Sequence, residues 1–93
     1  MLMRWLKKRE VVIYFLLYRK FGYSQFNLGE ALYELSPFFS KKVSLSVIKY
    51  LVKLGLLIRN NNYYFTLVPF EEYILLNSYD YLKRRSSLRR KIQ

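Results

Sequence analysis

The segment SLSVIKYLVKLGLLIRNNNYYFTL, residues 44–67, decides the fold. Its first part, residues 44–54, places apolar residues at the three- and four-residue spacing of a buried helix face. Gly55 follows, and glycine readily takes the left-handed conformation that ends a helix. Residues 56–67 then place two apolar stretches around a run of asparagines, which suits a tight turn because asparagine tolerates a positive φ. The segment therefore predicts a helix that leads directly into a β-hairpin.

Basic side chains share one face of this predicted helix. A polar stripe at positions i, i+4, i+7 and i+11 lies opposite the apolar residues. From residue 41 to residue 67 the chain has five basic residues and no acidic residue. A basic helix that is followed at once by a hairpin is typical of the recognition helix and wing of a winged helix-turn-helix, so the segment predicts contact with DNA. The stripe consists of Lys42, Ser46, Lys49 and Lys53.

The composition indicates one folded and strongly basic domain. The chain has 93 residues, of which 53% are hydrophobic and 19% aromatic, whereas a disordered basic tail would contain few such residues. The net charge of +11 favours a polyanion or an anionic surface as the partner. The apolar content is high for so small a domain, so we expect a second copy of the chain to cover part of it.

Several kinds of chemistry need residues that the chain lacks. Without Cys or His it has no disulfide, no thiol catalysis and no zinc site of the usual type. The six acidic residues are scattered, no pair of them suggests metal binding or acid–base catalysis, and no glycine-rich phosphate loop is present. We therefore expect a protein that is not an enzyme, with no cofactor, no metal and no small-molecule ligand.

No targeting or membrane segment is expected. The longest uncharged apolar run near the N-terminus, residues 11–18, is much shorter than the roughly 20 residues of a membrane span. Basic residues follow it without the small-residue cleavage site of a signal peptide. The helix that contains this run is too uniformly apolar for an interfacial anchor. The sequence therefore predicts a cytoplasmic protein with no membrane partner.

Two helices are predicted before the central segment. The first, over residues 6–21, is apolar around nearly its whole circumference and should be buried on most sides. The second, over residues 28–35, has Asn27 at the N-cap position and Glu30 where the acid of a capping box belongs.

One long helix is predicted after the hairpin, over residues 70–88, with Pro69 at its start. It carries apolar residues on more than one face, so one face can pack on its own domain and the other on a second chain. Its end, residues 83–91, is a basic run that is either a solvated helix end or a second patch for phosphate or protein. The expected dimer interface consists of Tyr73, Ile74, Leu75, Leu76, Tyr79 and Leu82.

The order of these elements predicts a mainly α fold with a small β-hairpin, a single winged helix-turn-helix domain over residues 1–93. Within it, the stretch VIKYLVKLGLL, residues 47–57, is similar to the end of the recognition helix in PadR and MarR-like families of archaeal DNA-binding proteins. This resemblance covers essentially the whole chain. The chain departs from PadR proteins in its short wing and in the lack of a second C-terminal helix.

The resemblance implies dimerisation through terminal helices and binding to inverted repeats. Within the group, the chain most resembles the AspA-type site-binding component of a crenarchaeal plasmid partition cassette. A protein of that kind would multimerise along DNA and bind a partner protein of the cassette.

Several candidate residues have a structural interpretation beside the functional one. Ser44 suits a helix cap as well as a phosphate contact, and Tyr50 suits the core as well as a DNA-facing position. Asn61 is a turn former that could also reach the DNA backbone, and Arg59 at the base of the wing could reach phosphate. The candidate DNA-binding residues are Lys41, Lys42, Ser44, Ser46, Lys49, Tyr50, Lys53, Arg59 and Asn61.

The predicted function is sequence-specific binding of double-stranded DNA at a palindromic site by a homodimer. Such a protein would act as a transcriptional repressor or as a plasmid-partition protein. The alternative is an adaptor that uses the winged-helix surface to bind protein and not DNA. An adaptor would be expected to show mixed charge on this surface, and the segment from residue 41 to residue 67 has no acid.

Overall fold

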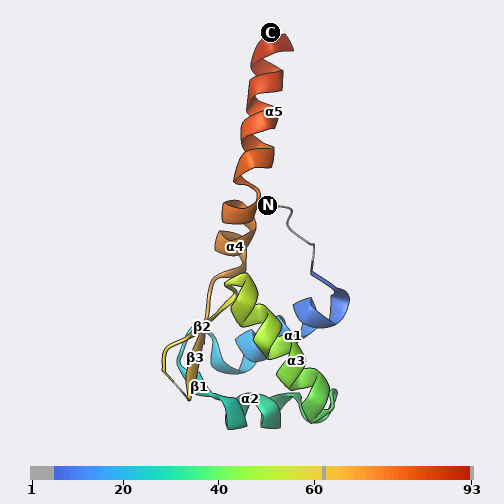
Figure 1. Ribbon diagram of the computed structural model, residues 1–93, viewed down its shortest axis with the longest axis vertical. Helices are drawn as coiled ribbons and strands as arrows, with labels where there is room; N and C mark the ends of the chain where they lie inside the picture. Colours follow the sequence, from blue (N-terminus) through green and yellow to red (C-terminus); the bar gives the residue numbers. More distant parts are fainter. Residues whose placement is uncertain (1–5, 62, 93) are drawn as a thin grey trace.

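The computed structural model describes residues 6–61 and 63–92 and shows a mainly helical chain with a small three-stranded antiparallel sheet (Figure 1). This confirms the predicted mainly α fold with a small antiparallel β-element. The elements in chain order are α1 (Lys8–Phe21), β1 (Phe26–Asn27), α2 (Leu28–Leu35), α3 (Lys41–Leu54), β2 (Leu57–Arg59), β3 (Tyr64–Leu67), α4 (Phe70–Asn77) and α5 (Tyr79–Ile92).

The first two helices begin at side-chain caps. At the start of α1, the backbone N–H of Lys7 donates to Glu10 Oε1 at 2.8 Å. At the start of α2, the N–H of Glu30 donates to Asn27 Oδ1 at 2.8 Å, and the N–H of Asn27 donates to Glu30 Oε1 at 3.0 Å. The second arrangement is the reciprocal capping box that the sequence predicts, and α2 has the predicted bounds.

Helix α3 begins at Lys41, earlier than the predicted start at residue 44. The cap is Ser40, whose Oγ accepts the N–H of Val43 at 3.2 Å. The helix ends at Gly55, which has a φ of 87°. There the N–H of Leu56 donates to the carbonyl of Leu51 at 2.9 Å. The N–H of Gly55 donates to the carbonyl of Val52 at 3.1 Å. These two hydrogen bonds close the C-terminal cap of a helix that ends in a residue of left-handed conformation.

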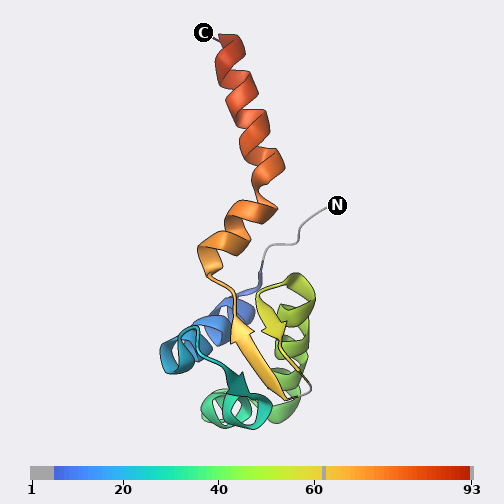
Figure 2. The same ribbon diagram turned by 90° about the vertical axis from the view of Figure 1, so that its left-hand side faces the viewer.

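The predicted hairpin is present as β2 paired antiparallel with β3, within the predicted range 56–67. Asn61 shapes its tip, because Asn61 Oδ1 accepts the backbone N–H groups of Tyr63 and Tyr64 at 2.8 and 3.1 Å. A third strand, β1, was not predicted. It pairs antiparallel with β3 through the neighbours Phe26 and Phe65, so that β3 lies between β1 and β2 (Figure 2).

The hydrophobic core lies where α1, α2 and α3 meet the sheet. Tyr73 of α4 is also buried there, with 4% of its surface exposed, and therefore does not belong to a free dimer interface as predicted. The buried apolar residues of the core are Ile13, Tyr14, Leu17, Phe26, Ala31, Leu35, Val47, Ile48, Leu51, Leu56, Leu57, Phe65, Leu67 and Tyr73.

The prediction that the first helix is buried on most sides is wrong. Helix α1 packs against α2 and α3 through one face, which carries Ile13 and Leu17. Its other face exposes Val12, Phe15 and Tyr18. Helix α4 meets part of that face, where the ring centroid of Phe70 lies 5.3 Å from that of Phe15. Because Val12, Phe15 and Tyr18 stay exposed beside it, part of the apolar surplus of the chain lies on α1.

The single long helix predicted over residues 70–88 is also wrong. The helix is interrupted at Ser78, which has a φ of −102° and a ψ of 4° and donates its N–H to the carbonyl of Ile74 at 2.9 Å. Two shorter helices result, so the chain does have a second C-terminal helix. Helix α5 extends away from the domain and accounts for the elongated shape of 54 × 23 × 23 Å (Figures 1 and 2).

Within the described residues, no helix combines the length and the apolar character needed to cross a membrane.

Tyr14 joins α1 to the segment between β3 and α4, because its hydroxyl donates to the backbone carbonyl of Val68. We expect Tyr14→Phe to lower the free energy of unfolding at pH 7 by about 1–3 kcal/mol, since the variant leaves that carbonyl without its donor. Chemical denaturation of both proteins measures the difference. Equal unfolding free energies at pH 7 would contradict this role of the hydroxyl.

The same bond should respond to alkaline pH. Burial raises the pKa of Tyr14 to about 12 from 10.0. The folded state therefore favours the neutral hydroxyl, so its contribution is complete below pH 10 and decreases as the pH rises toward 12. We expect the stability difference between the parent protein and Tyr14→Phe to shrink over that interval. A difference that grows over the same interval would reverse the assigned sign.

Candidate functional site

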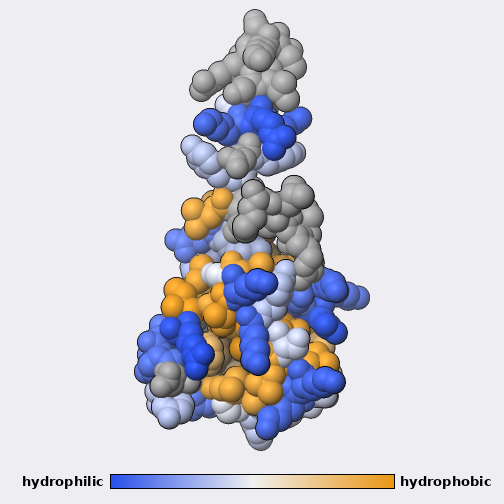
Figure 3. All heavy atoms as spheres, in the orientation of Figure 1, coloured by the Kyte–Doolittle hydropathy of each residue, from blue (hydrophilic) through white to orange (hydrophobic). Residues whose placement is uncertain are grey.

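The exposed face of α3 carries the predicted basic stripe. Its four members are all exposed, whereas Val47, Ile48 and Leu51 on the opposite face are buried. On the face of the molecule that Figure 3 shows, hydrophilic side chains stand out from the surface, and apolar surface lies between them. The stripe consists of Lys42, Ser46, Lys49 and Lys53, as the helical spacing predicts.

The first turn of α3 is electrostatically unfavourable. Lys41 and Lys42 are both exposed there, and the turn contains no acidic residue. Positive charge at a helix N-terminus opposes the helix dipole and costs roughly 0.3–1 kcal/mol for each exposed charge. An anion bound at this end would remove the repulsion and meet the free N–H groups of the helix. A bound anion would therefore stabilise this first turn relative to the protein without a ligand.

A hollow of about 250 Å³ lies between α3 and the sheet. Its lining includes Lys49 from the stripe and Arg59 from the end of β2, so the fold brings these two predicted site residues to one surface. The rest of the lining is apolar, which fits a group with an apolar body and an anionic end, such as a sugar and its phosphate. The lining consists of Leu28, Leu45, Ile48, Lys49, Val52, Arg59 and Phe65.

The tip of the hairpin is ordered by its own side chains. Arg59 Nε donates to the backbone carbonyl of Asn61 at 3.3 Å, and Asn60 Nδ2 donates to Thr66 Oγ1 at 3.3 Å. The side-chain oxygen of Asn61 is engaged by the turn, which confirms its structural interpretation. Its contact with a ligand stays a prediction.

Two other predicted DNA-contact residues of α3 are less exposed than the stripe. Ser44 is buried, with 1% of its surface exposed, so its hydroxyl cannot reach a ligand from this position. It is not the helix cap either, since Ser40 fills that role. Tyr50 is half-buried on α3. The prediction of Ser44 as a DNA-binding residue is therefore wrong.

The remaining candidate residues, on α4 and α5, divide into two groups. Leu75, Leu76, Tyr79 and Leu82 are exposed and remain available to a second molecule. Ile74 is half-buried and packs against the core.

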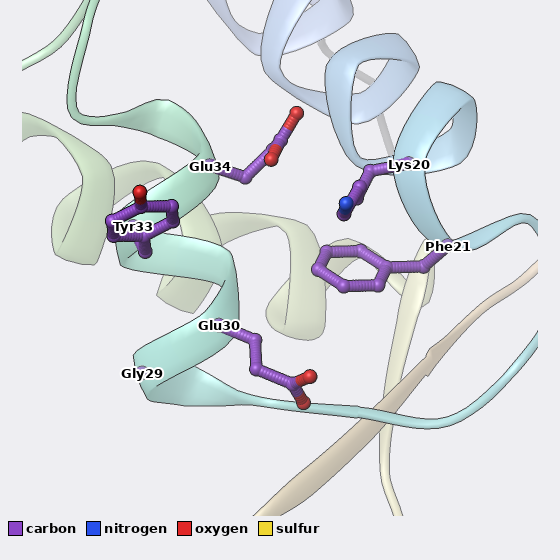
Figure 4. Close-up of a pocket in the computed structure, with 6 residues that line it drawn as sticks. All are labelled: Lys20, Phe21, Gly29, Glu30, Tyr33 and Glu34. Carbon is purple, nitrogen blue, oxygen red and sulfur yellow. The ribbon is translucent and has the colours of Figure 1, made fainter.

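A second hollow, of about 330 Å³, lies between the end of α1 and α2. In Figure 4 the side chains of Lys20 and Glu34 extend toward one another across it, and Tyr33 points away. Glu30 also lines the hollow, but its carboxylate is held by the capping box. The sequence signal for this site is the spacing of Glu30 and Glu34 on one helix face, which our prediction did not use.

The two hollows differ in the charge of the side chains that line them. In residues 6–61 and 63–92 no group of three or more acidic side chains is placed to hold a metal ion. The α1–α2 hollow has mixed charge, and the α3 hollow has two cations over an apolar floor. The latter arrangement can hold a phosphate by charge and hydrogen bonding.

Comparison of the chain with protein families, with curated proteins and with solved structures found no match. What the protein binds is therefore inferred from its own surface.

The buried Ser44 hydroxyl generates a stability prediction. Within the described residues its Oγ has no hydrogen-bond partner, so folding removes it from water without compensation. We expect Ser44→Ala to raise the free energy of unfolding by roughly 1 kcal/mol, because alanine removes the unpaired hydroxyl and favours the helix. Thermal unfolding against Ser46→Ala, an exposed control on the same helix, makes the comparison. A clear loss of stability in Ser44→Ala would show that the hydroxyl has a partner.

Proposed function

We propose that the protein is a winged helix-turn-helix protein that binds double-stranded DNA through α3 and the β2–β3 hairpin. The observation that carries the proposal is the shared hollow of Lys49 and Arg59, which joins the helix stripe to the base of the hairpin in one basic surface. The lack of any acid between residues 41 and 67 supports it, because no carboxylate repels phosphate along this surface.

In this proposal α3 enters the major groove, which admits one α-helix. Ser46 and Lys49 lie in the part of the stripe that reaches base edges, and Lys53 lies farther along and meets phosphate. Arg59, at the base of the hairpin, contacts the neighbouring DNA backbone. Its side chain is positioned by a hydrogen bond to the backbone carbonyl of Asn61. Phosphate neutralisation supplies most of the affinity, and the few base contacts supply the register.

The binding unit in the proposal is a homodimer on a palindromic site, with half-sites about 34–36 Å apart. The exposed apolar side chains of α4 and α5 support a second copy, because a monomer would leave Leu75, Leu76 and Tyr79 in water. Such a dimer would act as a transcriptional repressor, or as a partition protein that multimerises along DNA and binds a partner of its cassette.

The alternative of a protein-binding adaptor at the same surface has less support. A protein interface on α3 would be expected to mix charges, and the exposed stripe of α3 carries positive charge alone. Partner proteins are better matched by the mixed-charge hollow between α1 and α2.

Binding should depend steeply on salt. If the dimer neutralises roughly 6–10 phosphates, its affinity for duplex DNA should fall about 10³- to 10⁵-fold between 50 and 200 mM salt. Fluorescence anisotropy with a labelled duplex at four or five salt concentrations gives the slope. A flat dependence would mean that the charge of +11 is not what holds the partner.

Two lysines of the stripe should have different effects. Lys49→Ala should relax the preference for the palindrome at a cost of roughly 1–3 kcal/mol, because it removes a contact to a base edge. Lys53→Ala should weaken specific and random DNA alike and lower the salt slope by about one. Competition against scrambled DNA separates the two effects.

The matched control is Arg19→Ala, which removes one positive charge from the exposed surface of α1. It should have a smaller effect than either lysine variant. If both lysine variants bind the palindrome as tightly as the parent protein does, α3 is not the recognition helix.

A further inference from the structure

An aromatic groove of about 570 Å³ crosses the side of the molecule where α1 meets α4. It lies on the face of α1 that the core leaves exposed, and the α3 stripe contributes no residue to it. No function proposed so far uses the ring surface of this groove. Its lining consists of Phe15, Tyr18, Tyr23, Phe70, Glu71, Ile74 and Leu75.

The rings of the groove form a continuous row. The ring centroid of Phe15 lies 5.3 Å from that of Phe70 and 6.4 Å from that of Tyr18. The centroid of Tyr18 lies 5.2 Å from that of Tyr23. About half of the Tyr23 surface is exposed, and Phe15 and Tyr18 are exposed to a similar extent. The row therefore presents several aromatic faces and edges to a second molecule.

One carboxylate accompanies the rings. Glu71 lines the groove and is exposed at the start of α4. Partial burial raises the pKa of Tyr23, and Tyr18 and the nearby charge of Glu71 raise it further. The negative charge thus lies beside the ring row, and aromatic faces next to a carboxylate attract cations. In a chain with six acidic and 17 basic residues, such a surface is complementary to a basic segment of the chain itself.

Helix α5 presents such a segment. Lys83, Arg84 and Arg85 are exposed on the helix that extends away from the domain (Figure 1). With a rise of about 1.5 Å per helical residue, Arg84 lies roughly 20 Å along the chain from Glu71 of the same molecule. Beyond the break at Ser78, α5 extends away from the domain, so the structure keeps the basic segment away from its own groove and leaves the groove to a second copy.

We propose that the aromatic groove binds the segment Lys83–Arg85 of a second copy, with arginine side chains over the rings and paired with Glu71. The exposed Tyr79 and Leu82 would then cover Ile74 and Leu75 of the partner copy. A two-fold axis makes this contact twice, which favours a closed dimer. This inference rests on the homodimer of the proposed function and names the contact that forms it.

Charge reversal tests the contact. Glu71→Arg and Arg84→Glu should each raise the dimer dissociation constant about 10-fold or more, since each places like charges together. The double variant Glu71→Arg with Arg84→Glu should recover most of the affinity, because the pair is restored with the opposite polarity. Sedimentation equilibrium over a concentration series measures all four proteins.

The matched control is Glu72→Arg, because Glu72 is the exposed neighbour of Glu71 on α4 and does not line the groove. It makes the same change in net charge and should leave the dissociation constant within about 2-fold of the parent value. Thermal unfolding of each variant establishes that it is folded.

Two results would overturn the inference. One is equal weakening by Glu71→Arg and Glu72→Arg without recovery in the double variant. The other is sedimentation that shows a monomeric parent protein at micromolar concentration. A monomeric parent protein would also contradict the homodimer of the proposed function. The contact of α3 with DNA is measured separately by the Lys49→Ala competition, so the two failures can be told apart.

Discussion

The left-handed turn at Gly55 is the constraint on which the rest of the structure depends. Its φ of 87° lets α3 stop and the chain enter β2 with almost no connecting loop. The bond from the Leu56 N–H to the Leu51 carbonyl fixes this junction, and both side chains are fully buried. Because the junction is short and hydrogen-bonded, Arg59 at the end of β2 comes to the same hollow as Lys49 on α3. A side chain at residue 55 would strain the conformation that places them together.

The surface next to this junction carries charges that are unfavourable in the isolated domain and that a bound anion would stabilise. Lysines in the first turn of α3 oppose the helix dipole, and the whole stripe is positively charged. The core where α1, α2 and α3 meet the sheet buries large apolar side chains such as Tyr14, Phe26 and Leu51, and their burial offsets this cost. Departures from local stability rules are expected at functional sites, and here they coincide with the surface we assign to DNA. The exposed rings of α1 are a second such departure, and we assign them to a second copy of the chain.

Much of the fold could be predicted because short-range physics decides it. The capping box of Asn27 and Glu30 fixes the start of α2, and Gly55 fixes the end of α3. The start of α3 was misplaced because Ser40 and Ser44 can each cap a helix, and only packing shows that Ser44 is buried. Strand β1 has two residues, too few for a periodic pattern, and exists because β3 offers a free edge. The interruption at Ser78 and the burial of Tyr73 depend on how α4 docks, which spacing alone does not determine.

Chemical-shift mapping with isotope-labelled protein and a short DNA duplex tests the central assignment most directly. The proposal predicts that the largest changes in amide signals occur at Ser46, Lys49, Lys53 and Arg59, with small changes on α2 and α5. Changes that cluster at Tyr33 and Glu34 on α2, or no change on adding DNA in low salt, would contradict the assignment of α3 as the DNA-binding surface.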